Sequence, residues 1–436
     1  MELFCVDHLL MVEINCDEES LNIDFVFPTT NVANVGFGDD IQLGITGTEA
    51  VMQVVREIIV GFKWEEDALG RSKQHYRTTH ETLQKNLENL TTEKIMEKMT
   101  AEDPRFLSIE VDDVNSITLE EAKLAVMSQM LPADLEISVA GDLDVKEVLE
   151  MVHKYLGSIP SDTNEGYRKE AEKTMGSTPA LPTPGQYIEL ELEDSDPRAV
   201  AYVSGRAPNA WGFLADGSTV ADHVLKADKK ASDYDKRRRG HPLFAHVALR
   251  LISEIINRRL FSNVRERKQL TYDANFSFTG FERLAGSWFL VTVTASKEKA
   301  EAALEACKET LATLRKASPI SIDNVESAKR VVLNRHEIES RKSSYWTELM
   351  SGIQEETISL KGPLAVTDFH AVVESITPRD LQLVLETMGL DDNELYTAIG
   401  RTKKPVGLAT DEDDDEDELV RQAPVIGMRR GGALTG

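Results

Sequence analysis

The sequence predicts an α/β fold of two homologous units, each a mainly antiparallel sheet packed with helices. An internal repeat supports this: residues 114–141 align without a gap on residues 373–400, with seven identities. Upstream, residues 67–81 align on residues 323–337 at an offset that differs by only three residues. Because the two matches keep their order along the chain, we expect two copies of one α/β unit.

The first copy alternates strand-like and helix-like patterns. Residues 21–27 alternate apolar and polar side chains before Pro28, whereas residues 48–59 place valine and isoleucine at helical spacing. Ser116 or Thr118 can cap a further helix. The expected strands are 9–14, 21–27 and 135–140, and the expected helices are 48–59, a long polar helix from 65 to about 99, the capped helix, and 145–156.

The second copy contains the most regular pattern in the chain. Residues 244–260 repeat apolar side chains at three- and four-residue steps, which predicts a helix with a buried face. An alternating run over 274–279 predicts a strand, and the glycine-bounded stretch 280–286 predicts a hairpin turn. Residues 287–295 predict a second strand, which is either buried or able to pair with an extended substrate.

The two copies are unequal in length, and this sets the expected domains. Residues 1–160 are expected to form an incomplete α/β domain that lacks its opening third, and residues 186–402 are expected to form a complete one. Residues 161–185, rich in Pro, Gly, Ser and Thr, are expected to be a linker. Residues 403–436 contain eight adjacent carboxylates and are expected to be a disordered acidic tail.

Composition excludes several classes of function. A formal charge of −26 over 436 residues argues against a nucleic-acid partner, so the basic run 236–239 is expected to lie in a solvated loop. Three cysteines without metal-type spacing favour a reducing compartment. No apolar run is long enough to span a membrane, and the first residues lack the basic start of a targeting peptide.

The stretch after the apolar helix carries a family resemblance. Residues 257–261 read Asn-Arg-Arg-Leu-Phe, and Arg265 and Tyr272 follow as an Arg-x6-Tyr pair. This resembles a signature of the pitrilysin/insulinase-type zinc metallopeptidases. Residues 116–160 resemble the end of one domain of that family and residues 186–401 the domain after it. The resemblance implies two similar halves that close around an unfolded peptide.

The catalytic motif of that family, HxxEH, is absent from the sequence. In that motif two His on one helical face bind zinc and the Glu activates water. The nearest pattern, His80-Glu81 with His75 before it, lacks a second ligand and is better explained as a polar helix. We expect no metal site in this chain and zinc to be bound by a catalytic half outside it, upstream or on a partner subunit.

The resemblance assigns Arg265 and Tyr272 to substrate binding and transition-state stabilisation. Both side chains are hydrogen-bond donors, as contact with a substrate carbonyl and a forming oxyanion requires. The alternative interpretation is structural: Arg265 pairs with Glu266 or another surface acid, and Tyr272 packs at the start of the strand.

The whole chain then resembles the substrate-binding half of a zinc metalloendopeptidase that processes precursor peptides. Its long linker, basic insertion and acidic tail are similar to those of a family member that removes transit peptides in the chloroplast stroma; mitochondrial matrix and cytosol are the alternative locations. Its partners would be extended precursor peptides and a zinc-bearing half. A non-catalytic scaffold subunit of a heterodimer and an inactive fragment are the alternative functions.

Overall fold

The structure is a computed structural model that describes residues 2–29, 45–61, 63–130, 135–159, 185–316, 320–354 and 361–404. The chain divides into two compact units: Met1–Thr78 with Ile109–Gly176 and Glu337–Gly362, and Thr79–Ser108 with Ser177–His336 and Pro363–Gly436. Nearly all of the expected linker, 161–185, and acidic tail, 403–436, lies outside the described residues. The domain boundaries expected from the sequence stay a prediction.

The first unit combines a hairpin with short helices. Strands β1 (Met11–Cys16) and β2 (Leu21–Val26) pair antiparallel. A small core lies between the hairpin side chain of Phe25 and helix α2 (Gly47–Val60), whose Val51 and Val54 are buried. The other helices of this unit are α1 (Glu2–Asp7), α5 (Val111–Ser116), α6 (Leu119–Gln129), α7 (Val145–Tyr155) and α14 (Ser343–Met350), with most of α3 (Glu66–Gln84).

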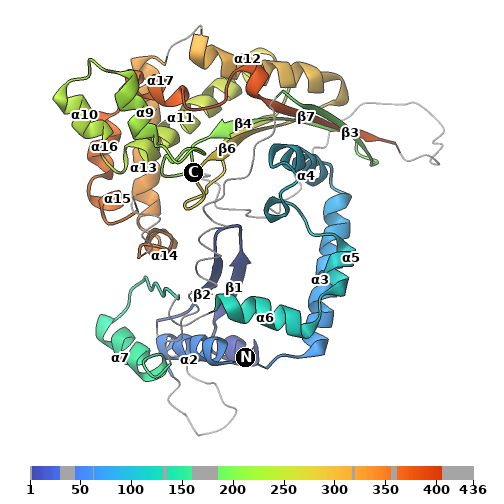
Figure 1. Cartoon of the computed structure of the whole chain (residues 1–436), viewed down its shortest axis with the longest axis vertical. Coiled ribbons are helices and arrows are strands. Elements are labelled where there is room, and N and C mark those ends of the chain that lie inside the picture. Colours follow the sequence, from blue (N-terminus) through green and yellow to red (C-terminus); the bar gives the residue numbers. More distant parts are fainter. Residues whose placement is uncertain are drawn as a thin grey trace. The chain divides into compact units, whose positions relative to one another are not determined.

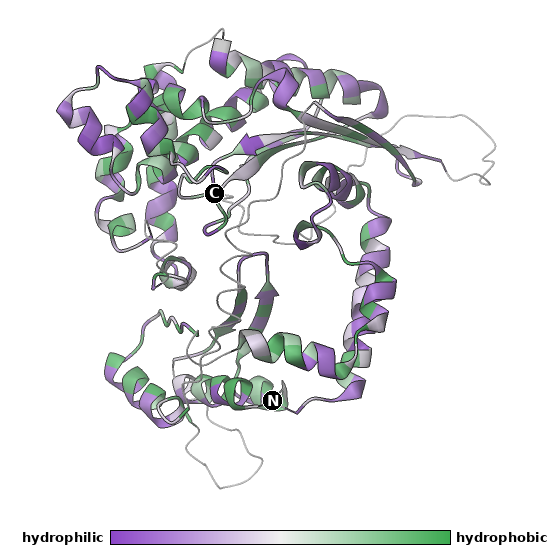
Figure 2. Ribbon diagram, in the orientation of Figure 1, coloured by the Kyte–Doolittle hydropathy of each residue, from purple (hydrophilic) through white to green (hydrophobic). Residues whose placement is uncertain are grey.

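The long polar helix expected from 65 to 99 is two helices. Helix α3 ends at Gln84, and α4 (Leu87–Met99) begins after Asn86, whose side chain accepts a 2.9 Å hydrogen bond from the N–H of Asn89. The cap at Asn86 therefore starts a second helix, although the polar pattern of the sequence predicted a single continuous helix. Helix α3 is largely hydrophilic in Figure 2 and has no buried residue, whereas α4 belongs to the second unit.

The strand expected at 135–140 is absent from the first unit. These residues are described but form no ladder. Their counterpart in the second copy, β7 (Tyr396–Lys403), is held between β3 (Tyr187–Glu193) and β4 (Ala199–Ala207). The described hairpin of the first unit pairs only with itself, so residues 135–140 lack such neighbours there.

The second unit is built on a five-stranded sheet in the order β3-β7-β4-β6-β5. Strands β5 (Asp273–Phe278) and β6 (Ser287–Ala295) form the expected hairpin, and every pairing is antiparallel except β3 with β7. Because β6 lies between β4 and β5, it cannot pair with a substrate. The helices are α4, α9 (Val220–Ala227), α10 (Asp233–Arg239), α11 (Phe244–Leu260), α12 (Ala300–Lys316), α13 (Ile322–Glu339), α15 (Leu364–Thr367), α16 (Phe369–Ser375) and α17 (Pro378–Leu385), with helical turns η1 (Pro104–Phe106), η3 (Phe261–Arg267), η4 (Lys297–Lys299) and η6 (Asp392–Glu394).

Helices cover both faces of this sheet. Helix α4 packs on one face, where Ile95 and Met99 join Tyr202 and Trp288 in a buried cluster. Helices α11 and α12 lie on the other face, as Figure 1 shows. The apolar face predicted over 244–260 is α11, whose residues such as Leu251 and Ile256 are fully buried. The predicted α/β class with a mainly antiparallel sheet is confirmed.

The internal repeat is visible in two equivalent helix starts. Thr118 begins α6 with a capping box, in which its hydroxyl accepts from the N–H of Glu121 and the Glu121 carboxylate accepts from the N–H of Thr118. Thr377 begins α17 with the same reciprocal pair, using Asp380. Of the two caps that the sequence left open, Thr118 is the one used.

A lysine contact is repeated as well. The Nζ atom of Lys73 donates to the carbonyl oxygen of Asn115 at 2.8 Å, and that of Lys329 donates to the carbonyl oxygen of Glu374 at 2.8 Å. Asn115 and Glu374 are equivalent in the repeat. Each lysine satisfies a carbonyl at the end of a short helix, α5 or α16, so both copies close the same turn in the same way.

The basic run 236–239 is not a solvated loop. It ends helix α10, and Arg239 is only 2% exposed. The carboxylate of Asp380, which is 0% exposed, accepts from Arg238 and, at 2.7 Å, from Arg239. Arg239 also bonds Asp228 at 2.9 Å. The expectation was wrong because the acidic partner lies about 140 residues further along the chain.

Candidate functional site

The candidate pair, Arg265 and Tyr272, lies on the segment that joins α11 to β5. Helix α11 reaches this segment beside the edge of the sheet, and Asn257 fixes the two together. The Asn257 side chain accepts from the N–H of Phe276 at 2.7 Å and donates to the carbonyl of Phe276 at 2.9 Å. Strand β5 is an edge strand, so Asn257 takes the place of a neighbouring strand at this residue.

Arg265 lies on η3, a π-helical turn that continues α11. Val264 beside it is fully buried, and Asn263 donates to the hydroxyl of Thr310 on α12 at 2.8 Å. Arg265 itself is exposed, with its guanidinium carbon 4.8 Å from the ring centre of Phe261. The turn is anchored by its buried neighbours, while the arginine head remains in solvent.

Further contacts hold the rest of this segment. Burial lowers the pKa of Arg259, whose guanidinium donates to Asn324 at 3.3 Å. Gln269 has a left-handed backbone, with φ of 50°, and its carbonyl accepts from Lys299 at 3.1 Å. A non-glycine residue in this region is uncommon and is held by its surroundings.

Tyr272 is the residue immediately before β5. The preceding residue, Thr271, is buried, and its hydroxyl donates to the carbonyl of Thr294 on β6 and accepts from the N–H of Asp273 at 3.0 Å. Tyr272 is 85% exposed. Thr271 therefore fixes the start of the strand, and the phenol that follows it stands in solvent.

The structural interpretation of these two residues expects an acidic partner for Arg265 and a packed side chain for Tyr272. Among the described residues, Arg265 has no ion pair with Glu266 or with another acid, and Tyr272 is not packed at the strand start. Both donors are available on a segment whose backbone is fixed on each side. This arrangement suits contact with an acceptor that the chain itself does not supply.

The described residues form no zinc-binding site. They contain no group of three or more His, Cys, Asp or Glu side chains arranged to hold a metal ion. His75, His80 and Glu81 lie on the exposed or half-exposed surface of α3 and belong to no such group. The residues that the structure describes therefore do not fit a zinc site, and no catalytic step is assigned to zinc among them. No described helix is long and apolar enough to cross a membrane.

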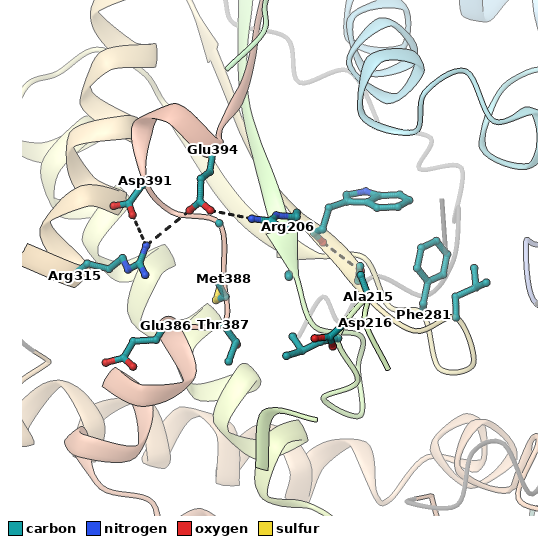
Figure 3. Close-up of a pocket in the computed structure, with 17 residues that line it drawn as sticks. Arg206, Ala215, Asp216, Phe281, Arg315, Glu386, Thr387, Met388, Asp391 and Glu394 are labelled. Atoms are coloured by element: carbon teal, nitrogen blue, oxygen red, sulfur yellow. Dashed lines mark hydrogen bonds and ion pairs between the residues drawn. The ribbon is translucent and has the colours of Figure 1, made fainter. Parts of the chain in front are cut away.

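A cavity of about 320 Å³ lies elsewhere in the second unit, near the end of β4 (Figure 3). Arg206 bonds Glu394 at 2.9 Å, and Arg315 bonds Asp391 at 2.8 Å. Neither Arg265 nor Tyr272 lines this cavity. Because both arginines that line it are held by carboxylates, the cavity does not offer a free cation for a substrate carboxylate.

The sequence was compared with those of known protein families. The family described as "Peptidase M16 inactive domain" matches residues 116–332, which include Arg265 and Tyr272. The chain carries an M16 inactive domain. The resemblance to the pitrilysin/insulinase-type peptidases, drawn from the motif around these two residues, is thereby confirmed.

The curated M16 relatives are chloroplast proteins. The chain is 31% identical to "Stromal processing peptidase, chloroplastic" of Arabidopsis thaliana over 458 aligned residues, which cover 100% of this chain and 34% of the relative. The same identity holds for the Pisum sativum protein, covering 99% of this chain and 34% of the relative. The chain thus spans about a third of the length of these relatives.

Two solved structures share the fold. A protease from Helicobacter pylori has a TM-score of 0.66 at 13% identity, covering 92% of this chain and 84% of that chain. The M16 inactive domain from Pseudomonas fluorescens has a TM-score of 0.60 at 15% identity, covering 81% of this chain and 74% of that chain. At these identities the likeness concerns the fold alone.

The sequence did not indicate the residues that position this M16 segment. Asn257 was noted only as part of the motif, and Thr271 and Gln269 were not singled out. Asn257 bonds a residue 19 positions away and Thr271 one 23 positions away. No pattern among neighbouring residues in the sequence predicts such contacts. A polar side chain on the otherwise apolar end of a helix was the one available signal for Asn257.

Proposed function

We propose that this chain is the non-zinc, substrate-binding half of a zinc metalloendopeptidase that processes precursor peptides, removing transit peptides in the chloroplast stroma. The matched inactive M16 domain and the similarity to stromal processing peptidases support this. The chain is inactive alone, and a zinc-bearing half, in the same polypeptide or on a partner subunit, completes the enzyme. The mitochondrial matrix and the cytosol are the alternative locations.

The observation that carries the proposal is the availability of two donors on a fixed backbone. Tyr272 is 85% exposed beside the buried Thr271, and Arg265 is exposed on a turn whose Val264 is buried. A side chain that only packs does not need such exposure. A side chain that contacts a substrate held by another half of the enzyme must be exposed.

The roles follow from the chemistry of the two groups. A planar guanidinium donates well to a carbonyl oxygen, so Arg265 holds the substrate backbone near the bond to be cleaved. The Tyr272 hydroxyl donates to the oxyanion that forms there, which is a contact stronger in the transition state than in the ground state. Zinc, when bound in the catalytic half, supplies activated water.

The overall charge fits a basic substrate. Transit peptides are rich in Arg and poor in acids, whereas this chain has a formal charge of −26. Opposite charges raise the rate of encounter, and the effect weakens as salt rises. We therefore expect kcat/KM on a basic precursor peptide to fall with ionic strength.

The test combines the chain with its catalytic half and measures turnover of a precursor peptide. Tyr272→Phe removes only the hydroxyl and is expected to lower kcat by about 10²-fold with little change in KM. Arg265→Ala is expected to lower kcat/KM by about 10-fold or more. Arg267→Ala, on the same turn, and Tyr234→Phe, a tyrosine 62% exposed on α10, are the matched controls and are expected to leave turnover unchanged.

The outcome separates this function from a scaffold. If Tyr272→Phe and Arg265→Ala turn over substrate as the parent does, the two residues do not contact the reacting peptide. A chain that is required for assembly but indifferent to both substitutions would be a non-catalytic partner subunit.

A further inference from the structure

The sheet has two edge strands, β5 and, at the opposite end, β3. Two backbone hydrogen bonds fix its pairing with β7: the N–H of Thr397 donates to the carbonyl of Gln186 at 2.9 Å, and the N–H of Asp194 donates to that of Lys403 at 3.0 Å. In a parallel ladder, residues at every second position face the partner strand. The even-numbered residues of β3 therefore bond β7, and the odd-numbered ones direct their N–H and C=O outward.

Within the second unit, no described strand pairs with that edge. Strand β3 ends the sheet in the strand order, and Figure 1 shows it at the outer side of the sheet. Its even-numbered side chains, such as Leu190, pack against the core cluster with α4, whereas Tyr187 is 52% exposed. A row of outward backbone groups is a template for one more strand.

The side chains beside this edge are mostly acidic. Glu189, Glu191 and Glu193 follow Tyr187 on the exposed face at two-residue spacing. Arg401 bonds Glu189 and lies 3.0 Å from Glu301, while Lys403 lies 3.8 Å from Glu191. Glu193 has no ion pair among the described residues.

A cavity of about 440 Å³ adjoins the start of this strand. Tyr187 lines it together with Thr397 and Ile399 of β7. Helix α12 contributes two further carboxylates, Glu301 and Glu305. Asp392 and the three glutamates of β3 bring the number of acidic side chains around the cavity and the strand to six. Three cations lie among them, namely Lys308, Arg401 and Lys403, so three negative charges are in excess.

We propose that the β3 edge is a docking site for an extended basic segment of a peptide, which adds to the sheet as a sixth strand. The outward backbone groups of β3 bond the peptide backbone, and every second side chain of the peptide, Lys or Arg, meets the carboxylates of the exposed face. The same carboxylates oppose pairing with a second copy of β3, because two rows of glutamate would face each other. A basic strand is the occupant that this edge accepts.

This inference deepens the proposed function, and rests on it for the source of the peptide, but its site is separate from Arg265 and Tyr272. Docking at β3 holds a basic stretch of the precursor at a distance from the bond to be cleaved. Binding energy gained there can then be used at the reacting centre. The docking itself needs no catalytic half.

The test measures binding of a fluorescein-labelled ten-residue peptide of alternating Lys and Thr to the full chain by fluorescence anisotropy. Two further peptides carry N-methyl groups on the backbone of the Lys residues only or of the Thr residues only. Strand addition uses one edge of the peptide, so one methylated peptide is expected to bind about tenfold more weakly and the other as the parent does. Equal binding by both would overturn strand addition.

Variants of the protein test the same edge from the other side. Glu191→Pro removes an outward N–H and is tolerated on an edge strand, and Glu191→Gln with Glu193→Gln removes charge but keeps the backbone. Both are expected to weaken binding at least severalfold, and circular dichroism checks that each folds. A peptide of alternating Glu and Thr is expected not to bind.

The two proposals fail separately. Tyr272→Phe and Arg265→Ala are expected to bind the Lys-Thr peptide as the parent does, because they leave β3 intact. If they lose binding while the β3 variants keep it, the peptide docks at the Arg265 and Tyr272 segment and the β3 site is wrong. If binding at β3 holds but the two substitutions leave turnover unchanged, the proposed catalytic contact is wrong instead.

Discussion

Asn257 uses both ends of its side-chain amide on a single residue, accepting from the N–H of Phe276 at 2.7 Å and donating to its carbonyl at 2.9 Å. This pair ties helix α11 to the edge strand β5. Because Arg265 and Tyr272 lie between the two elements, Asn257 sets the geometry of the segment without touching a substrate. It is a positioning residue in the proposed function.

Asn257→Ala is expected to destabilise the chain by about 1–3 kcal/mol, because it leaves two backbone groups of the edge strand without partners. Urea unfolding followed by circular dichroism measures this. Asn275→Ala, at an exposed position on the same strand, is the matched control and is expected to change stability by less than about 0.5 kcal/mol. Equal effects of the two variants would show that the amide pair is not the cause.

Asp380→Asn is expected to be among the most damaging single substitutions in the second unit. Its carboxylate is 0% exposed and bonds Arg238, Arg239 and Thr377. Removing one partner from a buried ion pair costs about 3–5 kcal/mol. Thermal unfolding of the full chain measures the loss.

The repeat supplies a matched control for Asp380. Glu121 fills the same capping-box position in the first unit, but it is exposed and has no arginine pair among the described residues. Glu121→Gln is expected to cost far less than Asp380→Asn, because Glu121 is exposed and glutamine can also complete the capping box at this position. A loss as large as that of Asp380→Asn would mean that the cap, rather than the arginine contacts, carries the stability.

The Asp380 contacts also predict a pH dependence. Burial alone would raise the pKa of this carboxyl, but hydrogen bonds from Arg238, Thr377 and Arg239 outweigh it and hold the pKa below its usual value. A pKa depressed on folding contributes stability above the unfolded pKa of about 3.9, and that stability is lost as pH falls through the folded pKa. The stability difference between parent and Asp380→Asn is therefore expected to be constant from about pH 7 to 5 and to shrink below about pH 4. A difference that grows on acidification would contradict this.

The cysteines are expected to react in a fixed order. Cys307 is fully buried on α12, and burial raises its pKa to about 12, so almost no thiolate forms at pH 8. Cys16 is an exposed residue, so a reagent can reach it. Partial burial of its thiol and the negative charges of Asp17 and Glu18 raise its pKa. Mass spectrometry after iodoacetamide treatment of the native chain is expected to find Cys16 labelled well before Cys307. Labelling of Cys307 at a similar rate would show that α12 opens readily.

The size of the native protein tests whether the proposed zinc-bearing half is part of the same polypeptide. The relatives are about three times as long, and the proposed function requires a zinc-bearing half. An antibody against the second unit is expected to detect a band well above the 48.6 kDa of these residues in the source tissue. A band near 48.6 kDa would direct the search to a separate catalytic subunit.

Local patterns predicted much of the second unit. The helix expected at 244–260 is Phe244–Leu260, and the hairpin around 280–286 joins β5 to β6, with Gly286 at a φ of 80°. These elements repeat apolar residues with the period of their own secondary structure, which the sequence displays directly. The family motif around Arg265 was found for a similar reason, since its residues are adjacent.

Contacts between distant residues account for what the sequence did not show. Arg238 and Arg239 were expected in solvent because of the overall charge of −26, yet both bond the carboxylate of Asp380, and Arg239 is buried. The break at Asn86 was missed because the helices on both sides share a polar pattern. The same limit hid Asn257, whose partner becomes visible only when α11 and β5 lie side by side.

The position of β7 between β3 and β4 has a consequence for synthesis on the ribosome. Tyr396–Lys403 leaves the ribosome after every other strand of the sheet, yet it is the strand that joins β3 to the rest. Until it emerges, β4, β6 and β5 each have a partner in the chain already made, whereas β3 lacks the only described strand with which it pairs. The five-stranded sheet can therefore be completed only after the last strand has been synthesised.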